Sequence, residues 1–146
     1  VKVFARRLEQ GQQLVDWFQS ILINTGQLID NRLSPFSLQP NTLARMLGEE
    51  SIHLIVNTTP LGMTSHPQGS AWPNSISLPR EAIIYDLVYT PAQTALIKRA
   101  RQNGLMAFNG LGMLVEQAAL AFEIWTGEPA PREAMWNAVK NWEKAS

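Results

Sequence analysis

The sequence of 146 residues contains no cysteine, which excludes disulfide bonds and thiolate metal sites. Its two histidines, His53 and His66, cannot by themselves form a typical zinc site. Twelve basic side chains balance twelve acidic ones, so charge provides no basis for binding nucleic acid or an anionic membrane surface. No apolar run approaches the roughly 20 residues that span a bilayer, and no signal peptide is visible. These absences favour a cytoplasmic protein that contacts neither nucleic acid nor membrane.

The composition is that of a folded domain. Hydrophobic residues make up 45% of the chain and charged residues 16%, a balance typical of a globular protein with a sizeable core. The chain begins "VKVFARR", without a methionine and inside an expected strand. We therefore expect a piece of a longer protein.

Hydrophobic periodicity and turn residues divide the chain into alternating strands and helices. In the first third we expect a strand over 1–5, a helix over 8–24 that ends at Thr25-Gly26, and a short edge strand within 32–39. Asn41 or Thr42 is expected to cap a short helix that runs through Leu47 and is closed by Gly48.

The remaining two thirds predict three strands and three helices. "SIHLIVNTT" (51–59) is typical of a buried strand, and residues 60–80 are rich in Pro, Gly and Ser and predict a long loop. Further strands are expected over 82–89 and 105–109, and helices from Thr90, as cap, to Asn103-Gly104, over 111–125 and over 131–144. Strands that are apolar on both faces and alternate with helices indicate a doubly wound α/β fold, with a parallel sheet covered on both sides and a right-handed crossover over 83–108.

In such a sheet, ligands bind beyond the carboxyl ends of the strands. The residues at these ends are Arg6-Arg7, Asn57-Thr58-Thr59, Leu87-Val88-Tyr89 and Asn109-Gly110. An arginine there suits a ribose phosphate, hydroxyls and amides suit riboses, and a glycine lets backbone approach a flat ring.

Each strand end also has a purely structural interpretation. The two arginines can be solvated charges at a helix start, residues 57–59 can form a plain turn before Pro60, and Tyr89 can be an ordinary rim aromatic. For Asp86, a carboxylate inside an apolar strand, we favour the interpretation that it ties down loop backbone.

Gln117 lies beside the apolar stripe expected on the helix over 111–125. The members of that stripe are Leu114, Ala118, Ala121, Phe122 and Trp125. A buried amide without partners costs about 1–3 kcal/mol, so backbone, water or a hydroxyl-bearing ligand must satisfy it. The periodicity alone leaves ligand and structure equally open.

Three motifs, "VNTTPLGM", "YDLVYTPAQTALIKRARQNG" and "NGLGMLVEQAALAFEIWTG", resemble the C-terminal, nucleotide-binding half of the shikimate dehydrogenases in order and spacing. The resemblance runs from residue 1 to about 130. It implies an incomplete doubly wound, Rossmann-like sheet with helices on both faces, in which 1–146 is a partial NADP-binding domain without its first strand and Gly-rich loop. It implies that the helix within 128–146 returns toward a substrate domain, and that the family reaction is NADPH-dependent reduction of 3-dehydroshikimate to shikimate.

The resemblance also implies roles for individual residues, none of them catalytic or metal-binding. Arg6, helped by Arg7, would bind the 2′-phosphate of NADP, although the family's Asn-Arg-Thr segment reads Ala5-Arg6-Arg7 here. Asn57, Thr58 and Thr59 would line the nicotinamide ribose, Leu87 and Gly110 would flank the nicotinamide through backbone, and Met113 would pack close to it. Tyr89 and Gln117 would face the hydroxyls of shikimate.

Two alternatives remain at this point. One is a quinate/shikimate dehydrogenase that uses NAD, which the arginines disfavour because no acid follows the strand to hold a ribose 2′-hydroxyl. The other is a non-catalytic nucleotide-binding or interaction module.

The apolar stripe of the last helix predicts a missing neighbour. Its members are Met135, Trp136, Val139 and Trp142. We expect part of this stripe to be uncovered, and we expect the strand over 1–5 either to lack a neighbour or to pair directly with 51–58. An uncovered apolar stripe and an unpaired strand edge would both promote association, for example as a homodimer.

Overall fold

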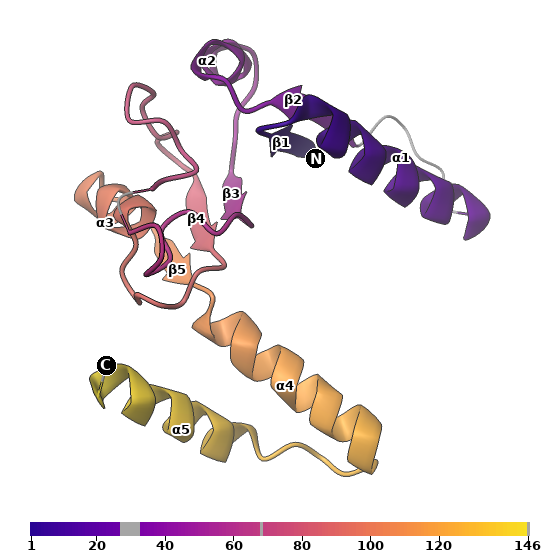
Figure 1. Cartoon of the computed structure of the whole chain (residues 1–146), viewed down its shortest axis with the longest axis vertical. Coiled ribbons are helices and arrows are strands. Elements are labelled where there is room, and N and C mark those ends of the chain that lie inside the picture. The colour runs from indigo at the N-terminus through magenta and orange to yellow at the C-terminus, as the bar shows by residue number, and fades with distance from the viewer. Residues whose placement is uncertain (27–32, 68, 146) are drawn as a thin grey trace. The chain divides into compact units, whose positions relative to one another are not determined.

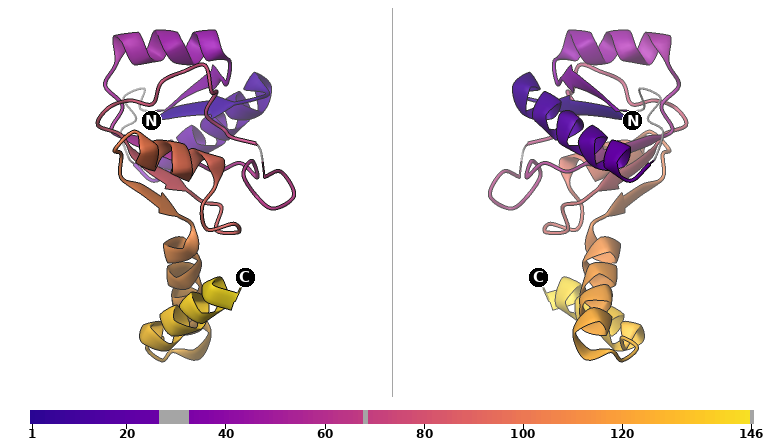
Figure 2. Two further views of the ribbon diagram at one scale, coloured as in Figure 1. Left: turned by 90° about the vertical axis from the view of Figure 1, so that its left-hand side faces the viewer. Right: turned by 90° about the vertical axis from the view of Figure 1, so that its right-hand side faces the viewer.

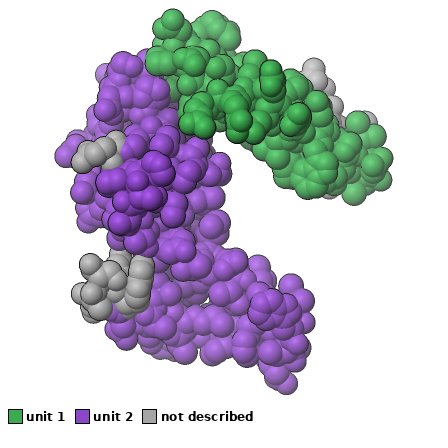
Figure 3. All heavy atoms as spheres, in the orientation of Figure 1, with its two compact units in different colours: residues 1–51 green, residues 52–146 purple. Residues whose placement is uncertain are grey.

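The computed structural model describes residues 1–26, 33–67 and 69–145, with the side chains of 142–145 outside the description. The described chain forms two compact units, residues 1–51 and residues 52–146 (Figure 3). Each unit contains strands and helices of its own, so each is described by itself.

The first unit is a two-stranded parallel sheet with helices. Strand β1 (Lys2–Ala5) pairs with β2 (Ser34–Ser37), and helix α1 (Leu8–Asn24) contacts both strands. Phe4 lies opposite Phe36, with their rings stacked 5.5 Å apart between centroids. The strand over 1–5, the helix over 8–24 and the edge strand are confirmed, and Gly26 ends the helix segment at a φ of 72° that favours glycine.

The boundaries expected for the next helix are wrong. Helix α2 spans Pro40–Glu49, so Asn41 and Thr42 lie inside it and Gly48 does not close it. Pro40 occupies the first helical position, where the missing N–H is not needed and the ring's fixed φ already suits a helix.

The second unit is a three-stranded parallel sheet in the order β3 (Leu54–Asn57), β4 (Ile83–Asp86), β5 (Ala107–Asn109). Helix α3 (Ala95–Gln102) connects β4 to β5 and contacts both, and α4 (Leu111–Thr126) and α5 (Arg132–Ala145) follow (Figure 1). The long loop, the three strands, the end of α3 at Asn103-Gly104 and the last two helices are confirmed within a few residues. The alternation of parallel strands with helices confirms the α/β class.

The two faces of this sheet differ in burial. On one face Ile84 and Ala107 lie in the core with Leu96, Ile97 and Ala100 of α3. On the other face Leu54 is 57% exposed, Val56 45% and Phe108 50%. The expectation that the run at 52–56 is fully buried is therefore wrong, because an apolar sequence does not specify which element covers each face.

Helix α3 begins four residues later than expected. Thr94, not Thr90, is its N-cap, and the Thr94 hydroxyl accepts a hydrogen bond from the Ile97 N–H at 3.2 Å. Pro91 therefore lies in the connecting loop. The bond from the Thr94 hydroxyl to Asp86 fixes where this helix begins.

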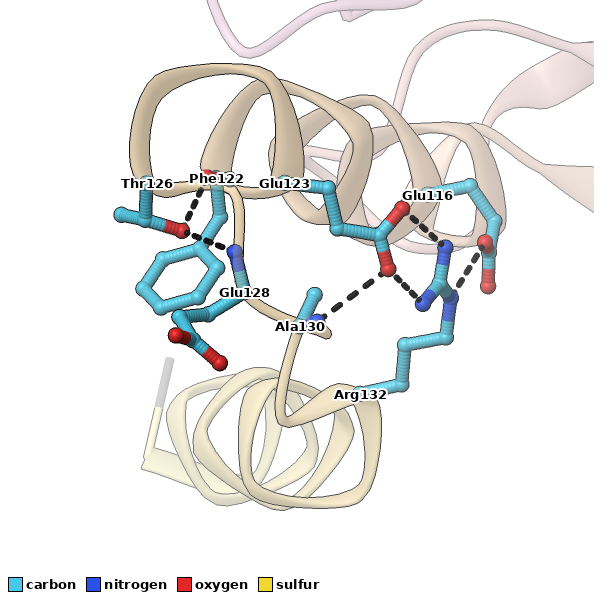
Figure 4. A network of polar contacts seen from close by, with 7 residues as sticks. All are labelled: Glu116, Phe122, Glu123, Thr126, Glu128, Ala130 and Arg132. Carbon is cyan, nitrogen blue, oxygen red and sulfur yellow. Dashed lines mark hydrogen bonds and ion pairs between the residues drawn. The ribbon is translucent and has the colours of Figure 1, made fainter.

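Helices α4 and α5 lie side by side, as Figures 1 and 2 agree. Arg132 at the start of α5 joins Glu123 at 2.5 Å and Glu116 at 3.2 Å on α4 (Figure 4). The hydrogen bonds from Arg132 and from the Ala130 N–H lower the pKa of Glu123, and the two carboxylates raise the pKa of Arg132.

The stripe expected on α4 is only partly right, because Leu114, Ala118, Ala121 and Phe122 are half-buried and none of its members is fully buried. The buried residues of α4 are Leu111, Val115 and Ala119, whereas Trp125 is 83% exposed and Gln117 is exposed. Gln117 is therefore no buried amide that needs a partner.

The stripe of α5 is half-covered. Met135, Trp136 and Val139 are half-buried, because α5 folds back on α4, and the side chain of Trp142 lies outside the described residues. Within its own unit, β1 has β2 as a neighbour, and β3 has β4. Within 1–26, 33–67 and 69–145, none of the helices has the length and apolar character required to cross a membrane.

Candidate functional site

The carboxyl ends of the three strands in the second unit form one row of polar residues. Asn57 lies opposite Asp86, and Asp86 lies opposite Asn109. The parallel register thus brings together the three segments that follow these residues, as the sequence predicts for the ligand-binding edge of such a sheet.

Asn57 is buried, and its side chain is fully used within the protein. Its amide nitrogen donates to the Leu61 carbonyl at 3.3 Å and to Asp86 Oδ1 at 2.8 Å. Its oxygen accepts from the N–H and the hydroxyl of Thr59, at 3.0 and 2.7 Å. These four bonds match the two donors and two acceptor positions of an amide, and they form a tight turn over 57–61.

Asp86 is fully buried and accepts three hydrogen bonds. The donors are Asn57 Nδ2, the Val88 N–H at 3.1 Å and the Thr94 hydroxyl at 2.6 Å. The prediction that this carboxylate ties down loop backbone is confirmed, and it also holds two side chains. Because all three donors are neutral, hydrogen bonds and not an ion pair compensate for its desolvation.

Gly110 lies directly against the backbone of Leu87. A Cβ atom at residue 110 would lie 2.1 Å from the Leu87 carbonyl oxygen and 2.7 Å from its carbonyl carbon. The two residues predicted to flank a flat ring are thus neighbours, and the Gly110 N–H donates to the Val88 carbonyl at 3.3 Å. A Cβ atom at residue 112 would instead have ordinary contacts, at 3.8 Å from the Trp136 ring and from the Tyr85 hydroxyl.

The remaining candidates of the second unit are accessible at the surface. Thr58 is exposed, Tyr89 is 37% exposed and Met113 is 40% exposed. Met113 and Gln117 lie four residues apart on α4, a spacing that places two side chains on one helix face.

Arg6 and Arg7 belong to the first unit and follow β1 directly. Both are exposed. Arg7 donates to Gln10 Oε1 at 3.1 Å, whereas Arg6 makes no hydrogen bond or ion pair to the described residues. The Arg6 guanidinium therefore has its full fork of donors available for an anion.

Two further residues help to build this edge: Thr94, which the sequence pattern does not identify, and Asn109, which the pattern places at a strand end without a role. Asn109 accepts from the Leu111 N–H at 3.2 Å and donates to the Ala92 carbonyl at 3.2 Å, so it joins the start of α4 to the loop before α3. The signal for Thr94 was present, since a threonine before "ALIKRA" is a good N-cap, but Thr90-Pro91 was the stronger start pattern. Among the described residues, no group of three or more His, Cys, Asp or Glu side chains is arranged to hold a metal ion.

Comparison with known proteins finds relatives in sequence and in fold. Residues 110–140 match the family described as the shikimate 5′-dehydrogenase C-terminal domain. The curated shikimate dehydrogenase (NADP(+)) of Crocosphaera subtropica is 45% identical over 100 residues, which are 67% of this chain and 34% of that protein. The structure of shikimate 5-dehydrogenase from Listeria monocytogenes, in complex with shikimate and NAD, matches with a TM-score of 0.77 at 27% identity, over 94% of this chain and 46% of that one. Quinate dehydrogenase from Corynebacterium glutamicum, in complex with NAD, matches with a TM-score of 0.77 at 26% identity, over 96% of this chain and 45% of that one.

These likenesses and the parallel strands define a Rossmann-like α/β protein. The chain belongs to the shikimate dehydrogenase family, in whose members it corresponds to the C-terminal domain. Its matched part spans about a third of the length of the curated relatives.

Proposed function

We propose that this chain binds NADP as the C-terminal part of a shikimate dehydrogenase, which reduces 3-dehydroshikimate to shikimate with NADPH. The observation that carries the proposal is the 45% identity over 100 residues to a relative named shikimate dehydrogenase (NADP(+)). Bound NADPH would supply the hydride. On this proposal, residues 1–146 are a partial NADP-binding domain, and 128–146 return toward the part of the enzyme that holds the substrate.

The geometry that supports NADP is the free guanidinium at the end of β1. Arg6 is exposed and has no partner among the described residues, so it can form two charged hydrogen bonds with a 2′-phosphate. Arg7 is held by Gln10 and adds positive charge beside it. We assign the 2′-phosphate to Arg6, with Arg7 in support.

The rest of the nucleotide would lie along the strand-end row. Thr58 and Thr59 would meet the nicotinamide ribose, with Asn57 holding their turn, while the backbone of Leu87 and Gly110 and the side chain of Met113 would flank the nicotinamide. Tyr89 and Gln117, both exposed, would meet the hydroxyls of shikimate. The accessible hydroxyl, phenol and amide groups support this assignment.

Arg6→Ala and Arg7→Ala test the phosphate assignment. A charged hydrogen bond contributes roughly 1.5–3 kcal/mol, so Arg6→Ala should weaken NADP binding about tenfold or more and leave NAD binding nearly unchanged. We expect a smaller effect from Arg7→Ala, because the Arg7 side chain is already bonded to Gln10. Equal weakening of NADP and NAD would show that the arginines do not read the phosphate.

Hydride transfer to a carbonyl also needs a proton donor beside the reacting oxygen. We assign no such donor to this chain, and we therefore predict that the purified chain forms no NADPH from shikimate and NADP⁺. Shikimate-dependent absorbance of NADPH above that of a sample without protein would contradict this.

The second candidate is a quinate/shikimate dehydrogenase that uses NAD. The likeness in fold to the NAD complex of a quinate dehydrogenase favours it. The two candidates differ in cofactor preference, because only the 2′-phosphate of NADP gives the arginines a partner.

Two broader features also belong to the proposal. A cytoplasmic location agrees with a cofactor of central metabolism and with the absence of cysteine. A homodimer would cover the exposed apolar side chains of the β3–β5 sheet, including Leu54, Val56 and Phe108.

A further inference from the structure

The buried polar residues of the described core are Asn57, Asp86 and Thr94, with exposed fractions of 3%, 0% and 1%. They come from three different segments: the end of β3, the end of β4 and the N-cap of α3. Asp86 contacts both of the others, Asn57 through Oδ1 and Thr94 through Oδ2. The Asp86 carboxylate therefore links its own segment to Asn57, 29 residues earlier in the chain, and to Thr94, 8 residues later.

The two side chains that donate to Asp86 each make further hydrogen bonds within their own segments. Asn57 holds the N–H and hydroxyl of Thr59, and the Thr59 hydroxyl accepts from the Leu61 N–H at 3.3 Å. Thr94 accepts from the Ile97 N–H and so begins α3. Asp86 itself accepts from the Val88 N–H, in the segment that touches Gly110. Loss of the carboxylate would leave a buried amide, a buried hydroxyl and a backbone N–H without their acceptor.

We propose that Asp86 is a positioning residue that fixes the turn over 57–61, residues 87–88 and the start of α3 in one arrangement, and that nucleotide affinity depends on that arrangement. The nucleotide-binding part of this inference rests on the proposed function. Asp86 is fully buried, so it acts through Asn57 and Val88 and does not touch the nucleotide.

Asn57 does not have a free side-chain group for the ribose contact that the family resemblance implies. All four hydrogen-bonding positions of its side chain are occupied within the protein. A direct contact with the ribose would require one of these bonds to break in a buried site. Asn57 is therefore a positioning residue as well, and the neighbouring hydroxyls belong to Thr58, which is exposed, and Thr59, which is half-buried.

Asp86→Ala, Asp86→Asn and a control, Ala119→Gly, test the inference in the 146-residue chain. Asp86→Ala removes all acceptor atoms, whereas Asp86→Asn keeps the shape and one oxygen, and its amide can donate to the Thr94 hydroxyl. Ala119→Gly removes a buried methyl group on α4 away from the linked segments and destabilises through local helix flexibility. Amide hydrogen exchange measured by NMR and titration with NADP⁺ are the two readouts.

We expect Asp86→Ala to accelerate exchange of the Thr59, Leu61 and Ile97 amides by about tenfold or more beyond the change in Ala119→Gly, because these donors lose their common anchor. The same variant should weaken NADP⁺ binding by about tenfold. Asp86→Asn should retain most of the amide protection and most of the NADP⁺ affinity of the wild-type chain. A purely structural role would instead predict that Asp86→Ala and Ala119→Gly bind NADP⁺ equally well once both are folded.

Exchange that changes only at Val88, or NADP⁺ affinity that is unchanged in folded Asp86→Ala, would overturn the inference. If Asp86→Ala does not fold, Thr94→Ala and Thr94→Ser are compared by the same two readouts. Only Thr94→Ala should accelerate exchange of the Thr59 amide. Unchanged exchange of the Thr59 amide in both variants would overturn the inference. A wild-type chain that does not bind NADP⁺ overturns the proposed function, and the exchange pattern then decides separately whether Asp86 couples the segments.

Discussion

Gly110→Ala introduces a side chain where the backbone of Leu87 already lies. The new Cβ would be 2.1 Å from the Leu87 carbonyl oxygen, and real Cβ atoms essentially never approach closer than 3.0 Å, so the backbone must separate by at least 3.0 − 2.1 = 0.9 Å. Overpacking costs about 1–3 kcal/mol, and we expect the upper end of that range because the contacted atoms are backbone and cannot rotate away. The φ of Gly110 is −75°, so the cost is steric and not conformational.

Gly112→Ala is the matched control two residues along the chain. Its Cβ would have no neighbour closer than 3.8 Å, and the position is helical, so alanine should stabilise by about 0.5–1 kcal/mol. The two variants should therefore differ by about 4 kcal/mol in the free energy of unfolding, the sum of about 3 and about 1. Urea unfolding followed by tryptophan fluorescence measures this difference, since Trp72 is buried in the same unit. A Gly110→Ala chain as stable as the Gly112→Ala chain would refute the close approach to Leu87.

Two further predictions concern α4. Because Arg132 holds the pKa of Glu123 below its usual value of 4.5, the stabilisation from this ion pair is complete above about pH 4.5 and is lost as pH falls through the lowered pKa. Glu123→Gln should therefore flatten the acid side of a plot of melting temperature against pH, and an unchanged plot would contradict the assignment. In the whole enzyme to which we assign this chain, we expect Gln117→Leu to weaken shikimate binding about tenfold, through lost hydrogen bonds, while stability changes by no more than about 0.5 kcal/mol because the residue is exposed. Calorimetric titration and thermal melts separate the two effects, and normal shikimate affinity would remove Gln117 from the site.

Local sequence patterns predict most of the elements, because the signals that end helices and strands are themselves local. Thr25-Gly26 and Asn103-Gly104 end their helices as expected, and Gly26 and Gly104 adopt φ values of 72° and 74° that favour glycine. The errors occur where two local signals compete. Pro40 competes with Asn41 and Thr42 at one helix start, and Thr94 competes with Thr90-Pro91 at another.

Burial depends on partners that lie far away in the sequence, and there the sequence is a weaker guide. Leu54 and Val56 are as apolar as Ile84, yet only Ile84 is covered by α3. The periodicity of α4 places Gln117 beside an apolar stripe, but it does not show which residues of that helix are fully covered. The role of Asp86 was predicted because a carboxylate in an apolar strand has few solutions other than hydrogen bonds to nearby backbone and side chains.

The ratio of the dissociation constants for NADP⁺ and NAD⁺, measured by calorimetric titration of the 146-residue chain at one salt concentration, tests the central claim most directly. A 2′-phosphate held by the free guanidinium of Arg6 predicts that NADP⁺ binds about tenfold or more tightly than NAD⁺. Equal affinities, tighter binding of NAD⁺ or binding of neither nucleotide would contradict the proposal that this chain is the NADP-binding part of a shikimate dehydrogenase.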